Sequence, residues 1–272
     1  MLDYDFMRTA FAAGAIVAIV AGTVGVFLVL RNLSFAGHAL SHVGFAGATG
    51  AALVGMSPLW GLVAFSLLGA AAMGLLGEKL RGRDVAVGII LSLALGCGVL
   101  FLHLYTAYAS QATALLFGNV LGVGGATLRV LLALAIVSLA ALAAIARPLI
   151  FATLEPELAE AKGVRLRLVS ALFLAIVAIA VAEAAQVVGV LLVFALMVGP
   201  PAAALGLTTR LGHAVALSAL LGLVETWAGI ALAYVTDWPT SFWIVLLSCL
   251  VYFASLAARR IIALGSEGAA FP

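Results

Sequence analysis

Charged residues are scarce in this chain. Asp, Glu, Lys and Arg make up 9% of its 272 residues, whereas apolar residues make up 66%. A soluble domain carries about 25% charged and about 45–50% apolar residues. No water-soluble core of this length requires so much apolar surface. The composition therefore excludes an ordinary soluble domain and indicates a protein embedded in a lipid bilayer.

The motifs of several enzyme classes are also missing. The sequence contains no G-x-x-x-x-G-K-[ST], so the chain cannot bind ATP through a P-loop. It contains neither H-E-x-x-H nor G-x-S-x-G, the motifs of zinc proteases and of α/β-hydrolases. The net charge of +2, without a basic run, argues against a nucleic-acid partner. The two cysteines, Cys97 and Cys249, lie in separate apolar runs, and we expect core positions for them rather than a disulfide.

Apolar runs, most of them near the roughly 20 residues that a spanning helix needs, follow one another along the chain. They cover Phe6–Leu30, Phe35–Val54, Leu59–Leu76, Val85–Tyr105, Leu128–Ala146, Leu168–Val181 (extending toward Gln186), Val187–Leu207, Ala214–Val235 and Phe242–Ala258. Only Glu183 and Gln186 mark the join between the sixth and seventh runs. We therefore expect an all-α, polytopic transmembrane bundle of about nine spans.

Lys and Arg indicate the orientation, because they concentrate on the cytoplasmic side of membrane proteins. With nine spans and an extracytoplasmic N-terminus, eleven of the 13 cations fall inside, and only Arg8 and Arg129 fall outside. The C-terminus is then cytoplasmic. The N-terminal sequence MLDYDFMRTA lacks a basic n-region, so we expect no removable signal peptide. The apolar but glycine-rich stretch Ala107–Thr127 falls between two spans on the outer side, and it predicts a short outer or re-entrant helix.

His38 and His42 are the main candidates for chemistry. They stand four residues apart in the second run, so both rings share one helix face. Two neutral imidazoles at this spacing can ligate zinc, and ionisable residues within a span tend to line a pathway. Ser41 beside them is a candidate hydrogen-bond donor. Two histidines do not complete a tetrahedral site, so other helices, a second subunit or water must supply the rest. The candidate further ligands are His103, Glu183, expected near the outer face, and Glu225, at the middle of the eighth run.

The segment Arg31–Gly50, RNLSFAGHALSHVGFAGATG, resembles the second span of the permeases of bacterial zinc and manganese ABC importers. The pattern of that family is R-x-L-S-F-x-G-[DH]-A-L-S-H-x-x-x-x-G, with Asp in many members where His38 stands here. Further stretches resemble the family in order and spacing: Leu116-Phe117-Gly118, Val188–Val193, Pro201–Ala204 and Asp237–Thr240, the last followed by Ser241 instead of Gly. The likeness covers nearly the whole chain.

The resemblance implies a single permease domain over residues 1–272, with the ABC importer fold of vitamin and siderophore permeases. It implies a homodimer in the bacterial inner membrane, ATPase subunits beneath it and an extracytoplasmic metal-binding protein above it. It also implies an ATPase-coupling helix within the polar segment 148–167. There Glu157, Ala159 and Gly163 match the family pattern D-x-E-x-A-x-x-x-G, and Glu155 replaces the Asp.

The resemblance implies no enzyme activity and no resident cofactor for this chain, since ATP is bound by the partner subunit. We expect zinc as the transported ion, because imidazole is a softer ligand than the carboxylate that suits manganese. Three alternatives stay open. One is a manganese, siderophore or vitamin permease of the same fold. Another is a proton-coupled secondary metal transporter, which Glu225 favours. The last is an intramembrane hydrolase that uses His and Glu.

Overall fold

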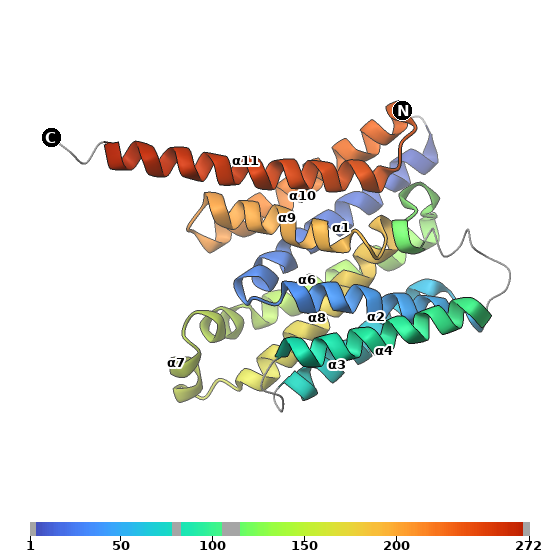
Figure 1. Ribbon diagram of the computed structural model, residues 1–272, viewed down its shortest axis with the longest axis horizontal. Helices are drawn as coiled ribbons and strands as arrows, with labels where there is room; N and C mark the ends of the chain where they lie inside the picture. The colour runs from blue at the N-terminus through green and yellow to red at the C-terminus, as the bar shows by residue number, and fades with distance from the viewer. Residues whose placement is uncertain (1–3, 78–82, 105–114, 269–272) are drawn as a thin grey trace.

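A computed structural model describes residues 4–77, 83–104 and 115–268 of the chain, and every regular element among these residues is helical. The elements are α1 (Asp5–Leu30), α2 (Ser34–Leu53), α3 (Pro58–Gly77), α4 (Arg83–Leu104), η1 (Val120–Gly122), α6 (Gly125–Leu154), α7 (Pro156–Ala161), α8 (Leu166–Val188), α9 (Val193–Leu207), α10 (Leu211–Thr236) and α11 (Thr240–Gly268) (Figure 1). Lys79 and Arg81, two of the cations used for orientation, lie outside the described residues.

Seven of these helices are long and apolar enough to cross a membrane: α1, α3, α4, α6, α8, α10 and α11. Helices α2 and α9 occupy the places of the two other expected spans but fall short of this criterion. Helix α9 has only 15 residues. Helix α2 has 20, but histidines, hydroxyl side chains and glycines lower its mean hydropathy. The structure therefore gives seven candidate spans instead of the nine expected.

Several helices extend beyond the expected runs, among them α6, α8 and α11, which continues to Gly268. Helix α6 continues through Pro148 to Leu154, although a proline inside a helix removes one backbone donor and often ends it. The expected join at Glu183 and Gln186 was wrong, because α8 runs on to Val188 and Glu183 is a fully buried residue within it. The chain turns instead at Gly189, whose φ of +93° is one that residues with a Cβ rarely adopt.

The described part of the stretch Ala107–Thr127 packs against this turn; residues 107–114 lie outside the described residues. The backbone N–H groups of Val190 and Leu191 donate to the carbonyls of Leu115 and Leu116 at 3.1 Å each. A Cβ on Gly189 would lie 2.2 Å from the backbone nitrogen of Gly118, so only glycine permits this approach. Irregular backbone at this place thus finds its hydrogen bonds within the protein, as a membrane environment requires.

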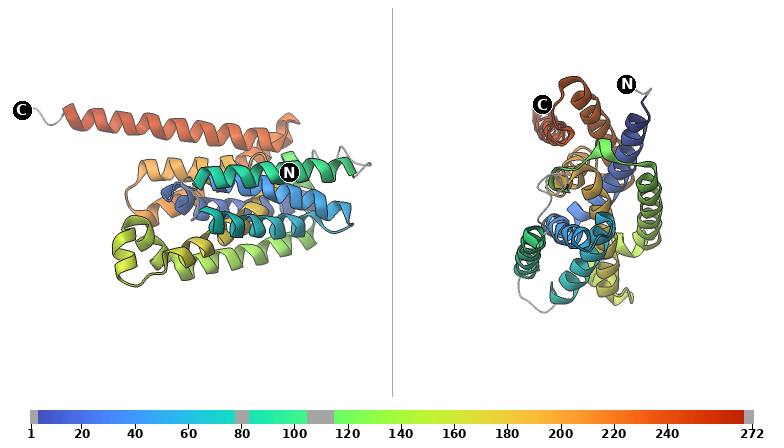
Figure 2. Two further views of the ribbon diagram at one scale, coloured as in Figure 1. Left: turned by 60° about the horizontal axis from the view of Figure 1, so that its bottom comes forward. Right: turned by 90° about the vertical axis from the view of Figure 1, so that its right-hand side faces the viewer.

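Helix α1 runs through the middle of the bundle and packs against α6, α8, α9 and α10. Helices α2, α3 and α4 pack together on one side of α1. Helices α10 and α11 lie on its other side, and α9 packs against each of these two helices (Figures 1 and 2). The short helix α7 lies at one end of the bundle, the end toward which the C-terminal half of α11 projects (Figure 1).

Glycines bring neighbouring helix backbones into contact. The clearest case joins α2 to α3, where a Cβ on Gly47 would lie 2.1 Å from the carbonyl oxygen of Gly61. Gly25 of α1 likewise lies against the backbone of Met197 in α9. Lipid tails are as apolar as leucine, so membrane helices associate through such close packing rather than through a hydrophobic driving force.

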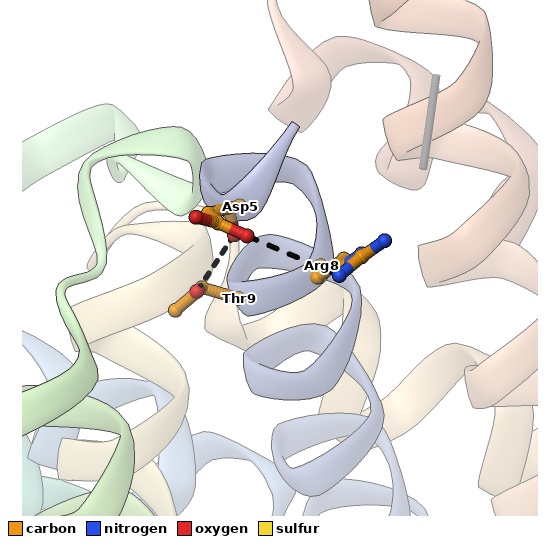
Figure 3. A network of polar contacts seen from close by, with 3 residues as sticks. All are labelled: Asp5, Arg8 and Thr9. Atoms are coloured by element: carbon orange, nitrogen blue, oxygen red, sulfur yellow. Dashed lines mark hydrogen bonds and ion pairs between the residues drawn. The ribbon is translucent and has the colours of Figure 1, made fainter. Parts of the chain in front are cut away.

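Arg8, one of the two cations expected outside, is balanced locally. Its Nη1 lies 4.0 Å from Oδ1 of Asp5, one turn earlier in α1, and the Thr9 hydroxyl donates to the Asp5 carbonyl at 2.9 Å (Figure 3). Both charged side chains are largely exposed, so the ion pair contributes little to stability. The neighbouring carboxylate nevertheless offsets the charge of an arginine at the start of α1.

Replacing Gly47 with alanine is expected to force α2 and α3 apart, because the added methyl group meets the Gly61 carbonyl and the Phe65 side chain. Overpacking of this kind costs about 1–3 kcal/mol. The thermal midpoint of the purified protein in detergent should therefore fall. Gly88→Ala in α4 is the matched control, since a Cβ there meets nothing within 4 Å. Equal midpoints for the two variants would contradict the close α2–α3 contact.

Candidate functional site

Helix α2 positions the histidine pair, and it begins directly after a tight turn. Asn32 takes a left-handed φ of +55°, and the N–H of Leu33 donates to the Leu28 carbonyl at 2.9 Å. Within the helix the rings of His38 and His42 meet edge to face, with their centroids 4.8 Å apart. The two imidazoles are thus neighbours on one face, as their spacing predicted, and they are close enough to ligate one ion.

His38 has an unused ligand atom. Its Nδ1 is buried and has no hydrogen-bond partner in the described part of the chain, and its ring packs against Phe194 of α9 at 5.3 Å. The Ser41 hydroxyl donates to the backbone carbonyl of His38 at 2.7 Å. The expected hydrogen bond from Ser41 therefore goes to the backbone. A buried nitrogen without a partner is unfavourable unless a proton donor or a metal ion occupies the space beside it.

A cavity of about 450 Å³ opens beside His38, between α9 and α11. Its wall is mostly apolar, with Phe194 and Val198 on α9 and Val245 and Phe253 on α11. The polar side chains of the lining are His38, Ser248, Cys249 and Tyr252. Ser248 and Tyr252 were missed from the sequence, although with Cys249 they share one face of the last apolar run. Cys249 was expected at a core position, but it is exposed and lines this cavity. The cavity offers few competing ligands to an ion held by His38.

Glu225 lies behind this cavity wall. It is 2% exposed in α10, next to Ser248, but neither carboxyl oxygen has a hydrogen-bond partner in the described residues. Glu183 is fully buried in α8 beside Ser138 of α6, also with both oxygens unpartnered there. Neither glutamate lines the cavity that contains His38. The two carboxyl groups thus occupy separate places in the bundle.

His103 lies exposed in the last turn of α4. Phe101, two residues earlier, packs beside Gly50 of α2. Gly50 follows His38 by twelve residues, which is roughly 18 Å along a helix axis. The described residues contain no group of three or more His, Cys, Asp or Glu side chains placed to hold a metal ion. Of the five predicted ligands, the structure brings only His38 and His42 together.

The predicted coupling segment is a short helix followed by a sharp turn. Glu155 and Glu157 are exposed at the start of α7, whereas Ala159 is fully buried. Gly163 adopts φ +83° and ends the helix, and the N–H of Val164 returns to the Ala159 carbonyl at 3.0 Å. Ala159 is therefore packed against the protein, whereas the acidic side chains of the segment are exposed.

The sequence profile of the ABC 3 transport family matches residues 3–259 of this chain. The chain belongs to the ABC 3 transport family. It is 30% identical over 253 residues to the manganese transport system membrane protein MntC of Halalkalibacterium halodurans, covering 93% of this chain and 87% of that protein.

Further proteins are similar to this chain over most of their length. The manganese import system permease protein ScaB of Streptococcus gordonii is 26% identical over 254 residues, which cover 93% of this chain and 91% of ScaB. The solved structure of PsaBC from Streptococcus pneumoniae in complex with Fab superimposes with a TM-score of 0.84 at 25% identity, covering 93% of this chain and 91% of that one. These likenesses give this chain the ABC permease fold.

Replacing His42 with alanine is expected to weaken zinc binding by the purified protein at least tenfold, about 1.4 kcal/mol, because one of two adjacent imidazoles is lost. His38→Ala should act similarly. His103→Ala is the matched control and should bind zinc like the wild type, since that residue lies exposed at the far end of α4. Equilibrium titration against a competing chelator, at equal folded protein, measures the affinities. An unchanged zinc affinity in His42→Ala would remove the pair from the site.

Proposed function

We propose that this chain is the permease subunit of an ATP-driven importer of a divalent metal ion. The observation that carries the proposal is the His38–His42 pair on α2, in which His38 has a buried, unpartnered Nδ1 and lines the cavity between α9 and α11. A transported ion must be released, so a site with two protein ligands and water suits a pathway better than a closed four-ligand site. Membership of the ABC 3 transport family supports the same function.

The energy comes from a separate ATPase subunit, because this sequence contains no P-loop. We propose that the ATPase docks on the segment 148–167, through the exposed side chains of Glu155, directly before α7, and Glu157 in α7. An extracytoplasmic binding protein delivers the metal to the opposite side. Ala159 and Gly163 act by shaping this docking segment, since one is buried and the other adopts a positive φ.

We propose zinc as the ion, because both adjacent ligands are imidazoles and imidazole binds zinc readily. Manganese is the second candidate, since the relatives MntC and ScaB are named as manganese proteins. An aspartate at the position of His38 would favour manganese, because carboxylate is a harder ligand than imidazole. The identity of residue 38 thus becomes a proposed determinant of ion preference.

A second copy of the chain completes the pathway in this proposal. The cavity beside His38 opens on a face where large apolar side chains remain exposed in the single chain, among them Phe194 at 39% and Phe253 at 63%. A homodimer packed on α9 and α11 would cover that face and add the ligands that one chain lacks. The proposed permease is therefore a homodimer in the bacterial inner membrane.

The proposed topology has nine crossings, with α2 and α9 added to the seven candidate spans. Helix α2 packs between α3 and α4, and α9 packs against α1, α10 and α11, so neither needs a fully apolar surface toward lipid. An odd number of crossings places the start of α1 and the end of α11 on opposite sides. The N-terminus is then extracytoplasmic and the C-terminus cytoplasmic.

Reporter fusions test this topology. A fusion at Arg165, between α7 and α8, should report a cytoplasmic position, and a fusion at Asp237, between α10 and α11, an extracytoplasmic one. Enzymatic reporters that are active on only one side of the membrane give the reading. A cytoplasmic signal at Asp237 would contradict nine crossings with this orientation.

Metal uptake tests the function. Proteoliposomes that contain the permease and its ATPase should accumulate zinc only when ATP is supplied, and vesicles without the ATPase should not. His38→Asp should raise the ratio of manganese to zinc uptake several-fold, because carboxylate is the harder ligand. His38→Asn is the matched control, because asparagine has the shape of aspartate without its charge. It should not raise the ratio of manganese to zinc uptake. ATP-independent zinc uptake driven by a pH gradient would favour a secondary transporter instead.

A further inference from the structure

Arg31 joins three helices at the end of the bundle that carries α7. It follows the last residue of α1, and its Nη2 donates to the Ser170 hydroxyl in the first turns of α8 at 2.7 Å. Its Nη1 donates to the Thr153 hydroxyl in the last turn of α6 at 3.3 Å. The two acceptors are 122 and 139 residues away in the sequence, so these bonds are tertiary contacts between distant segments.

The guanidinium is held in one orientation. Its central carbon lies 5.8 Å from the ring centroid of Phe173, which is fully buried in α8. The Thr153 hydroxyl donates its own proton to the Leu149 carbonyl at 2.6 Å and therefore presents its oxygen to Arg31 as an acceptor. Arginine suits this place because its planar group has several donors in fixed directions, whereas a lysine ammonium is a single point charge.

Both acceptors lie close to α7, one on either side of it in the sequence, and Thr153 is itself part of the proposed ATPase-docking segment 148–167. Thr153 is three residues before Pro156, the first residue of α7, and Ser170 lies four residues into α8, which follows α7 after a short turn. The segment between them is compact, because Ala159 is fully buried and the turn at Gly163 is closed by backbone hydrogen bonds. A displacement of α7 must therefore move Thr153 and Ser170, and with them the Arg31 guanidinium.

In the sequence, Arg31 is followed closely by α2, which carries the proposed metal ligands His38 and His42. Only Asn32 and Leu33 separate it from α2, and the turn is closed by the bond from the Leu33 N–H to the Leu28 carbonyl at 2.9 Å. The Leu28 side chain fills the space above Gly37, where a Cβ would lie 2.9 Å from it. His38 is the next residue. A movement of Arg31 therefore reaches the histidine pair through a short and stiff connection.

We propose that Arg31 is a positioning residue that transmits movement of the ATPase-docking segment to helix α2 and its histidine pair. The inference rests on the proposed function and adds the route by which ATP hydrolysis alters the metal site. Arg31 does not touch the ion. Its loss should leave zinc binding intact and should lower the amount of zinc carried for each ATP hydrolysed.

The test uses the permease reconstituted with its ATPase in proteoliposomes, with zinc as the ion. Arg31→Met should reduce zinc transported per ATP at least tenfold, while zinc affinity and ATPase assembly remain those of the wild type. Arg31→Lys should not restore the ratio fully, because one ammonium does not reach both hydroxyls in the same geometry. Arg210→Met is the matched control, an exposed cation at the start of α10, and should keep the wild-type ratio.

A second variant keeps the test decisive if Arg31→Met fails to fold. Thr153→Val with Ser170→Ala retains the arginine and removes both acceptors, and it should lower the ratio in the same way. A wild-type ratio of zinc transported per ATP in the folded Arg31→Met variant or in this double variant would overturn the proposal. A loss of zinc affinity equal to the loss of transport would overturn it as well. A wild-type protein that transports no metal with ATP would instead overturn the proposed function, and this inference with it.

Discussion

Close contact between helix backbones is the constraint on which the rest of this structure depends. A chain with 9% charged residues has few polar side chains with which to hold its helices together in lipid. Glycines remove the side chains that would separate the backbones, as where Gly47 meets Gly61 and where Gly25 meets Met197. These contacts fix α2 against α3 and fix α1 against α9. His38 on α2 is thereby held against Phe194 at the start of α9.

Polar groups inside the bundle fall into two classes. Most hydroxyls satisfy a carbonyl of the same helix or of a neighbour. Ser66 donates to Leu40, Ser218 to Gly22 and Ser248 to Ala195. The exceptions include His38 Nδ1 and the carboxyl groups of Glu183 and Glu225, which have no partner in the described residues. An unpartnered polar group within a membrane is costly, so such groups point to function. We assign a role only to His38, because it lines the cavity between α9 and α11 and the two glutamates do not.

The sequence predicted the helices well wherever apolar runs were separated by polar or turn residues. It also predicted that His38 and His42 share a face, because four residues make about one helical turn. The continuation of α6 through Pro148 was missed, since tertiary packing outweighs the local preference of proline to end a helix. The turn at Gly189 was missed because a positive φ in an apolar run leaves no mark except a glycine, and this chain has 29.

The other features that the sequence did not predict are contacts between segments far apart in the chain. Nothing near Arg31 in the sequence indicates Thr153 or Ser170 as its partners, because those residues lie more than 120 positions away. The cavity beside His38 likewise needs α9 and α11 to be placed against α2. The separation of Glu183, Glu225 and His103 from the histidine pair also depends on the packing of helices, and no spacing rule predicts it.

We propose that the two imidazoles of α2 hold the transported ion. X-ray absorption of the zinc-loaded permease tests it most directly, because the spectrum reports the ligand atoms and their distances. We expect imidazole nitrogens at about 2.0–2.1 Å from zinc, and the loss of the imidazole signal in the variant that carries both His38→Ala and His42→Ala. A first shell without imidazole in the wild type, or an imidazole signal that persists unchanged in the double variant, would contradict it.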